Sequence, residues 1–117
     1  MLTLYKQSAN TIARQRRQQW LFEARLNFFV SEIMYSLDIG DADEIAAALK
    51  RTFEACYILE IPLERNFKKV YCFDGQNLIA DWKVSALAHY LLVINCNPSN
   101  KHVAKAQLYY AMHKSSQ

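Results

Sequence analysis

Three cysteines and three histidines are the residues of this 117-residue chain that could supply a nucleophile and its base. A reactive thiol needs a base or a positive charge beside it, and no histidine stands next to a cysteine in the sequence. Cys56 falls on the apolar side of an expected helix and Cys96 beside a helix end, which is typical of thiols that pack in a core. A small hydrolase using one Cys and one His stays as the enzyme alternative, but we expect a protein that is not an enzyme.

Metal ligation and carboxylate chemistry have equally little support. The sequence contains no Cys-x-x-Cys or His-x-x-x-His pair, so no metal or other cofactor is expected. Asp38, Asp41, Asp43 and Glu44 could be drawn as an acid and base pair. The start of a helix explains this cluster better, because the helix dipole favours negative charge there.

Basic residues are the stronger candidates for function. Arg14, Arg16 and Arg17 alternate with glutamines and precede Trp20, a combination suited to phosphate contacts with side chains able to read base edges. A solvated helix face is the alternative interpretation of this segment.

Five lysines further along the chain could join these arginines. Lys68 and Lys69 begin an expected hairpin, Lys83 follows it, and Lys101 and Lys105 share one face of the last expected helix. If these sides converge, they form a positive groove with aromatic rings for stacking. The rings would come from Tyr71, Trp82 and Tyr109. The predicted DNA-binding residues are therefore Arg14, Arg16, Arg17, Lys68, Lys69, Lys83, Lys101 and Lys105.

The net charge of +3 hides a basic, acidic, basic order. Residues 1–30 hold five Lys or Arg against one acid, residues 31–64 hold two against eight, and residues 65–117 hold seven against two, giving +4, −6 and +5. This order indicates either two basic surfaces around an acidic one or ordinary solvated helix faces.

Composition and length point to one folded domain. Hydrophobic residues make up 52% and charged residues 21% of the chain. This composition excludes the kind of disordered chain that has too few apolar residues to form a core. No apolar run reaches the roughly 18 residues of a membrane span, and the first residues are too polar for a signal peptide. An odd number of widely spaced cysteines fits a reduced compartment, so a cytoplasmic protein is expected, with no membrane partner.

The first elements allow two interpretations. Apolar residues recur at three-to-four spacing as far as Leu37, which predicts one long helix. Residues 19–30 are also aromatic and β-branched enough for strands, in which case Ser31 caps a short helix near 31–38. Gly40 then ends this segment.

The later elements are clearer. A helix over 42–57 follows an acidic start, with a buried stripe at helical spacing, and Pro62 breaks the chain after it. Asp74-Gly75 between two aromatic runs predicts a hairpin of strands 69–73 and 78–82. Helices are expected over 84–95, with Leu87 in the buried stripe, and over 98–113, with Asn97 as its N-cap. The buried stripe of the 42–57 helix is Ile45, Ala48, Leu49, Thr52, Phe53 and Cys56.

Several segments in order resemble known families. Residues 28–40, FFVSEIMYSLDIG, resemble the opening of the BRO-type phage antirepressor N-terminal domain. Residues 48–56, ALKRTFEAC, residues 81–98, DWKVSALAHYLLVINCNP, and residues 103–111, VAKAQLYYA, resemble the DNA-damage-inducible protein D family. Ala86 and Cys96 depart from the family pattern, which usually has a basic residue and a glycine there.

The resemblance implies a strand followed by a short helix in the 19–37 region, and a module of phage or mobile-element type that acts on DNA or on a DNA-associated protein. We therefore expect an α+β fold in which a small antiparallel sheet, made of the 69–82 hairpin and strands near 19–30, is packed by about four helices. The resemblance implies that residues 1–117 form one BRO-type domain, in which residues 1–18 are expected to be a basic N-terminal extension. The alternative is a protein-interaction or dimerisation module with no nucleic-acid role, based on the tyrosines and the acidic middle segment. The expected partners are DNA, another protein or a second copy.

Overall fold

A computed structural model of the chain describes residues 25–114. The elements run β1 (Phe28–Phe29), α2 (Val30–Ser36), α3 (Ala42–Ile58), α4 (Leu63–Asn66), β2 (Phe67–Asp74), β3 (Asn77–Val84), α5 (Ala86–Ile94) and α6 (Lys101–Lys114). The three strands form one antiparallel sheet in the order β1-β3-β2. The α+β class is therefore confirmed. The basic extension 1–18 and the strand expected over residues 19–24 lie outside the described residues.

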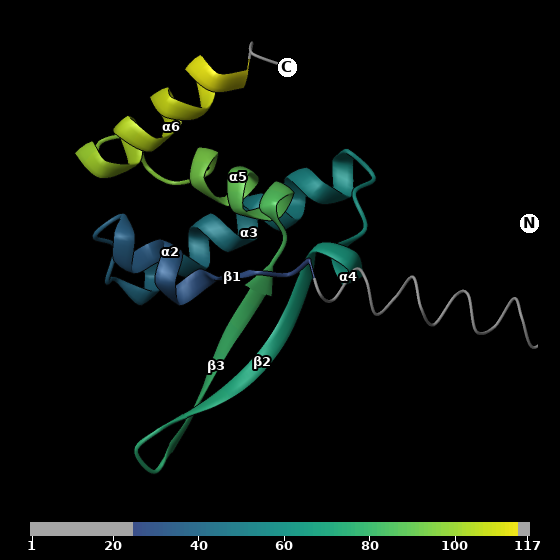
Figure 1. Cartoon of the computed structure of the whole chain (residues 1–117), viewed down its shortest axis with the longest axis vertical. Coiled ribbons are helices and arrows are strands. Elements are labelled where there is room, and N and C mark those ends of the chain that lie inside the picture. The colour runs from purple at the N-terminus through teal and green to yellow at the C-terminus, as the bar shows by residue number, and fades with distance from the viewer. Residues whose placement is uncertain (1–24, 115–117) are drawn as a thin grey trace, which may run out of the picture.

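The molecule has a helical body from which one hairpin projects. Figure 1 shows α2, α3, α5 and α6 gathered at one end, with the β2–β3 ribbon extending away from them toward the other end. The core lies inside the helical body and reaches only the base of the ribbon, where Phe67 and Val84 are buried. Its largest fully buried side chains are Met34, Leu92, Val84, Val93, Val103, Thr52 and Cys56.

The start of the described chain is a short strand followed by a short helix, which resolves the ambiguity in favour of the second interpretation. Phe28 and Phe29 pair with Val84 and Lys83, and α2 begins directly after them. The expectation that Ser31 caps this helix is wrong. The Ser31 hydroxyl instead donates to the Asp81 carboxylate on β3 at 2.6 Å, so it ties α2 to the ribbon.

Helix α3 matches its prediction closely. Asp41 is the N-cap, and its carboxylate accepts a hydrogen bond from the Asp43 backbone N–H at 3.0 Å. The predicted stripe faces the core, with Thr52 fully buried and its hydroxyl donating to the Ala48 carbonyl at 2.8 Å. Pairing the hydroxyl with this carbonyl removes the cost of burying it.

The C-terminal ends of α2 and α3 are both formed without glycine. Asp38 and Glu60 both have φ of 58°, in the left-handed region, and the N–H of the residue that follows each bonds back five residues into the helix. Both are Schellman-type helix ends in which an acidic residue takes the left-handed position that glycine usually occupies. The prediction that Gly40 ends α2 is therefore wrong by two residues, because Asp38 takes the left-handed position.

The hairpin is longer than predicted and has a two-residue turn. Its strands are paired from Phe67 opposite Val84 to Asp74 opposite Asn77. Gly75 has φ of +66° at the first turn position, the place of glycine in a type II′ turn. The short helix α4 just before the hairpin was not predicted, since only four residues separate Pro62 from β2.

Helices α5 and α6 also differ from expectation at their starts. Ser85 caps α5 by accepting from the Ala88 N–H at 3.1 Å, and Leu87 of the predicted buried stripe is 46% exposed. Helix α6 begins at Lys101, because the Asn100 side chain accepts from the His102 N–H at 2.8 Å. Asn97 instead accepts from the Ser99 N–H at 3.0 Å and forms a turn, so it is not the N-cap that the sequence suggested.

Candidate nucleic-acid interface

Helix α6 is held in place by two polar side chains, Asn100 and Gln107, and by one apolar side. Asn100 at its start donates to the Leu37 carbonyl at 2.9 Å, which joins it to the end of α2. Gln107 donates to the carbonyls of Val93 at 3.0 Å and Cys96 at 3.1 Å, so it satisfies carbonyl groups at the end of α5. Val103 is fully buried on the side that packs against the core.

The other side of α6 is exposed and basic. Lys101 and Lys105 are exposed and lie one helical turn apart. The sequence of α6 contains three lysines and two histidines and no Asp or Glu. Lys101 also stands in the first turn, where the helix dipole is already positive, so this end of the helix favours an anion over another cation.

Aromatic surface continues the basic side toward the end of α6. Tyr109 is 57% exposed, and its ring stacks on His113 with centroids 3.9 Å apart. The His113 Nδ1 lies 2.9 Å from the Tyr109 carbonyl oxygen. Leu108 and Met112 are exposed nearby on the same helix, at 59% and 65%.

A second group of lysines lies at the base of the ribbon. Lys68 on β2 is directly opposite Lys83 on β3. Lys69, on the other face of the ribbon, is opposite Trp82, and its Nζ lies 5.8 Å from the Trp82 ring centroid and 5.9 Å from that of Tyr71. The Lys83 Nζ lies 6.0 Å from the Phe29 ring centroid. Of the rings expected near the lysines, Tyr71 and Trp82 therefore lie beside Lys69.

The two groups of lysines do not form one groove. Helix α6 packs on α5 at one end of the molecule, while the ribbon extends toward the opposite end (Figure 1). Tyr109 accordingly lies with Lys101 and Lys105 and not with Tyr71 and Trp82. Arg14, Arg16 and Arg17 lie outside the described residues. The five predicted lysines therefore lie in two separate groups, and they do not form the single positive groove that the sequence allowed.

The thiols have environments that suppress reactivity, except at one position. Cys56 and Cys96 are buried, and burial raises the pKa of each, that of Cys96 to about 11. The Cys96 thiol lies 3.2 Å from the Leu92 carbonyl oxygen, to which it donates. Cys72 is exposed on the ribbon.

His89 is half-buried against the Phe28 ring, at a centroid distance of 4.7 Å, and burial lowers its pKa. Within residues 25–114, no three His, Cys, Asp or Glu side chains lie close enough together to hold a metal ion.

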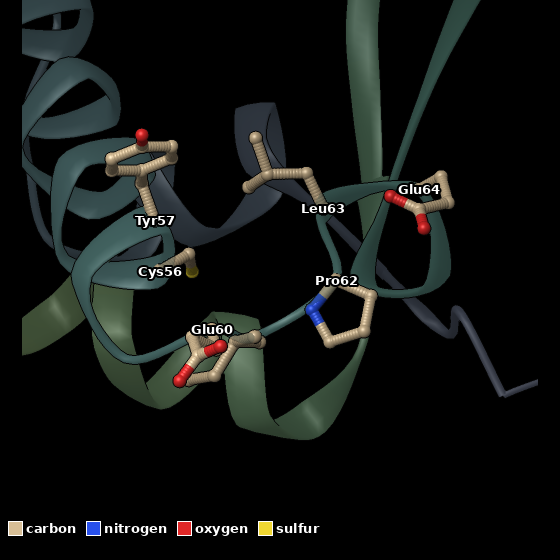
Figure 2. A pocket seen from close by; sticks show the side chains of 7 residues that line it. Cys56, Tyr57, Glu60, Pro62, Leu63 and Glu64 are labelled. Carbon is tan, nitrogen blue, oxygen red and sulfur yellow. The ribbon is translucent and has the colours of Figure 1, made fainter.

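A shallow hollow of about 390 Å³ lies where α3 ends and α4 begins. Figure 2 shows Tyr57 and Leu63 at its upper side, with Glu60 and Glu64 on either side of Pro62. No sequence pattern other than Pro62 itself pointed to this hollow. Its two carboxylates make it unsuited to a phosphate-bearing ligand.

No family model, curated protein or solved structure matches the chain. The resemblance to the BRO-type and DNA-damage-inducible families therefore stays a prediction. Across the described residues, no helix is long and apolar enough to cross a membrane.

Proposed function

We propose that the chain is a non-enzymatic DNA-binding module of the BRO type, acting in the cytoplasm, and that the exposed side of α6 contacts the duplex. The observation that carries the proposal is the charge of this helix, where Lys101 and Lys105 are both exposed and no carboxylate is present. An α-helix fits the major groove of B-DNA, and lysines on its outer side would reach the phosphates.

The way α6 is mounted supports this role. Helices α5 and α6 are consecutive and packed together, and hydrogen bonds from Gln107 and Asn100 fix α6 against the body. Its outer side therefore keeps a defined orientation without a ligand, which lowers the ordering cost of binding. At the ribbon base, Lys68 and Lys83 lie on one face and Lys69 on the other, and these lysines would contact DNA only if the duplex extended or bent toward the ribbon.

The experiment is a fluorescence-anisotropy titration of a labelled duplex at several salt concentrations. Each phosphate contact contributes about −0.9 to the slope of log K against log salt, so the Lys101→Gln/Lys105→Gln double variant is expected to make the slope less negative by about 1.8. Lys50→Gln is the matched control, because Lys50 is an exposed lysine on α3, a helix that begins with acidic residues. It is expected to leave the slope unchanged.

Two results would overturn the proposal. The first is the absence of binding to any duplex at low salt. The second is binding whose salt slope is the same in the wild type and in the Lys101→Gln/Lys105→Gln variant while the Lys50→Gln control also behaves as wild type. A slope reduced by Lys68→Gln/Lys83→Gln and not by the α6 variant would assign the contact to the ribbon and refute the role of α6.

A further inference from the structure

The outer part of the β2–β3 ribbon exposes apolar side chains that nothing in the described part of the chain covers. Tyr71 is 60% exposed, Phe73 78%, Leu78 60% and Ile79 46%. The pairing register places Tyr71, Phe73 and Leu78 on one face and Ile79 on the other. A two-stranded ribbon is marginally stable by itself, and exposed apolar surface of this kind indicates an interaction site.

The edge of β2 is open for strand pairing over its whole length. Within the described residues β2 pairs with β3 alone, whereas β1 covers the outer edge of β3 at Lys83 and Val84. In a two-residue hairpin the residues flanking the turn exchange their hydrogen bonds, and pairs alternate from there. By this alternation, the backbone N–H and C=O groups of Lys69, Tyr71 and Phe73 point away from β3 and are available to a further strand.

The charges along β2 select its partner. Lys68 lies at the base of β2, and Asp74 lies at its tip. If two copies of β2 pair antiparallel about a two-fold axis at Tyr71, Asp74 of each copy is opposite Lys68 of the other. The same register puts Phe73 opposite Lys69, within reach of a cation–π contact.

The neighbouring registers lack these pairs. A shift of two residues in either direction, which keeps the alternation of hydrogen bonds, places Asp74 opposite Asn66 or opposite Val70. Neither side chain can pair with a carboxylate as an ammonium does. The edge of β3 offers no comparable match, because its Asp81 carboxylate already accepts hydrogen bonds from Ser31 and β1 occupies its base.

We propose that two copies of this chain associate through β2, centred on Tyr71, to form a continuous six-stranded sheet in the order β1-β3-β2-β2-β3-β1. The second copy supplies the hydrogen-bonding partner for the open edge, places Asp74 beside Lys68, and packs apolar side chains on both faces. The dimer does not depend on DNA binding, and its test uses no nucleic acid.

The first experiment measures mass in solution by light scattering and sedimentation over a range of concentrations. Tyr71→Pro removes an N–H that the hairpin itself does not use, so it is expected to give a folded monomer. Ala80→Pro is the matched control, since Ala80 lies directly opposite Tyr71 but on the edge of β3, and it is expected to remain a dimer. A monomeric wild type, or a dimer lost in Ala80→Pro and kept in Tyr71→Pro, would overturn the proposal.

The second experiment is independent of the stability of the proline variants. In a Cys72→Ser background, Tyr71→Cys places the new thiols opposite each other across the two-fold axis, so mild oxidation is expected to give a disulfide-linked dimer. Ala80→Cys in the same background is expected to stay uncrosslinked. Equal crosslinking of both variants would refute the pairing.

Charge reversal tests the register. Two symmetry-related exposed ion pairs are each worth about 0.2–1 kcal/mol, so Asp74→Lys is expected to raise the dimer Kd about 2- to 30-fold. Adding Lys68→Asp should restore the wild-type Kd. Failure of the double variant to recover would exclude this register, and association of the ribbon with a different protein in place of a second copy would refute self-pairing.

Discussion

The buried thiol of Cys96 gives a sharp test of the claim that the chain is not a thiol enzyme. The perturbation is the removal of the other two thiols, so that Cys72→Ser/Cys56→Ala leaves Cys96 alone and Cys56→Ala/Cys96→Ala leaves Cys72 alone. Cys96 is 4% exposed, and burial raises its pKa from 9.0 to about 11. Cys72 is exposed on the ribbon.

The magnitude follows from the thiolate fraction. At pH 8 a thiol with a pKa of 9.0 is roughly 10% ionised and one with a pKa of about 11 roughly 0.1%, a difference of about 100-fold. Because the reagent must also reach a buried sulfur, Cys96 is expected to react with a disulfide reagent at least about 100-fold more slowly in the native protein than in the unfolded chain, whereas the exposed Cys72 should react readily in both.

The assay is the absorbance change of an aromatic disulfide reagent under native conditions, repeated in denaturant. Both chains should react at similar rates once unfolded, which controls for intrinsic differences between the two sites. Cys96 reacting as fast as Cys72 in the native protein would refute the reasoning. It would also restore the alternative of a nucleophilic thiol, which the enzyme hypothesis requires.

Further predictions concern stability, each measured by chemical denaturation. The pKa of Cys96 is higher folded than unfolded, so its contribution is complete below pH 9 and is lost as pH rises toward about 11, by about 2 kcal/mol, a loss that should vanish in Cys96→Ala. Leu92→Ala should cost about 2–5 kcal/mol because Leu92 is fully buried, whereas the exposed Leu108→Ala should cost less than about 0.5 kcal/mol. Glu60→Gly should stabilise the protein by about 0.5–1 kcal/mol by relieving the left-handed backbone, and a loss of stability would contradict that account. Ser31→Ala should cost about 1 kcal/mol, because it removes the hydroxyl's bond to the Asp81 carboxylate and leaves the bond from the Ser31 backbone N–H in place.

Local patterns in the sequence predicted the long elements and failed where a distant contact decides. Helix α3 could be predicted because Asp41, the apolar stripe and the polar outer side all act within one segment. The start of α6 could not, since Asn97 and Asn100 are both good caps and the choice depends on the bond from Asn100 to Leu37, 63 residues away. Ser31 is a similar case, because its hydroxyl bonds to Asp81 on a strand 50 residues later.

The candidate site was predictable in its residues and not in its arrangement. Spacing placed Lys101 and Lys105 on one side of a helix, and that side is exposed. The position of Lys69 opposite Trp82 follows from the register of the hairpin, which the structure supplies. The separation of α6 from the ribbon depends on α5, which contacts α6, α3 and β3. No local sequence pattern encodes this packing.

In the described part of the molecule the buried polar groups are hydrogen-bonded, and the unfavourable features lie on two surfaces. Within residues 25–114, no buried side-chain nitrogen or oxygen lacks a hydrogen-bond partner. The exceptions to local consistency are the exposed apolar side chains of the ribbon, and Lys101 at the positive end of α6.

Conflicts of this kind persist where a partner relieves them, and these two call for partners of different chemistry. The open edge of the ribbon fits another strand, whereas the exposed side of α6 fits an anion. Since the two surfaces lie at opposite ends of the molecule (Figure 1), occupation of one leaves the other open. Pairing through β2 would therefore produce a dimer that carries two α6 helices related by the same two-fold axis.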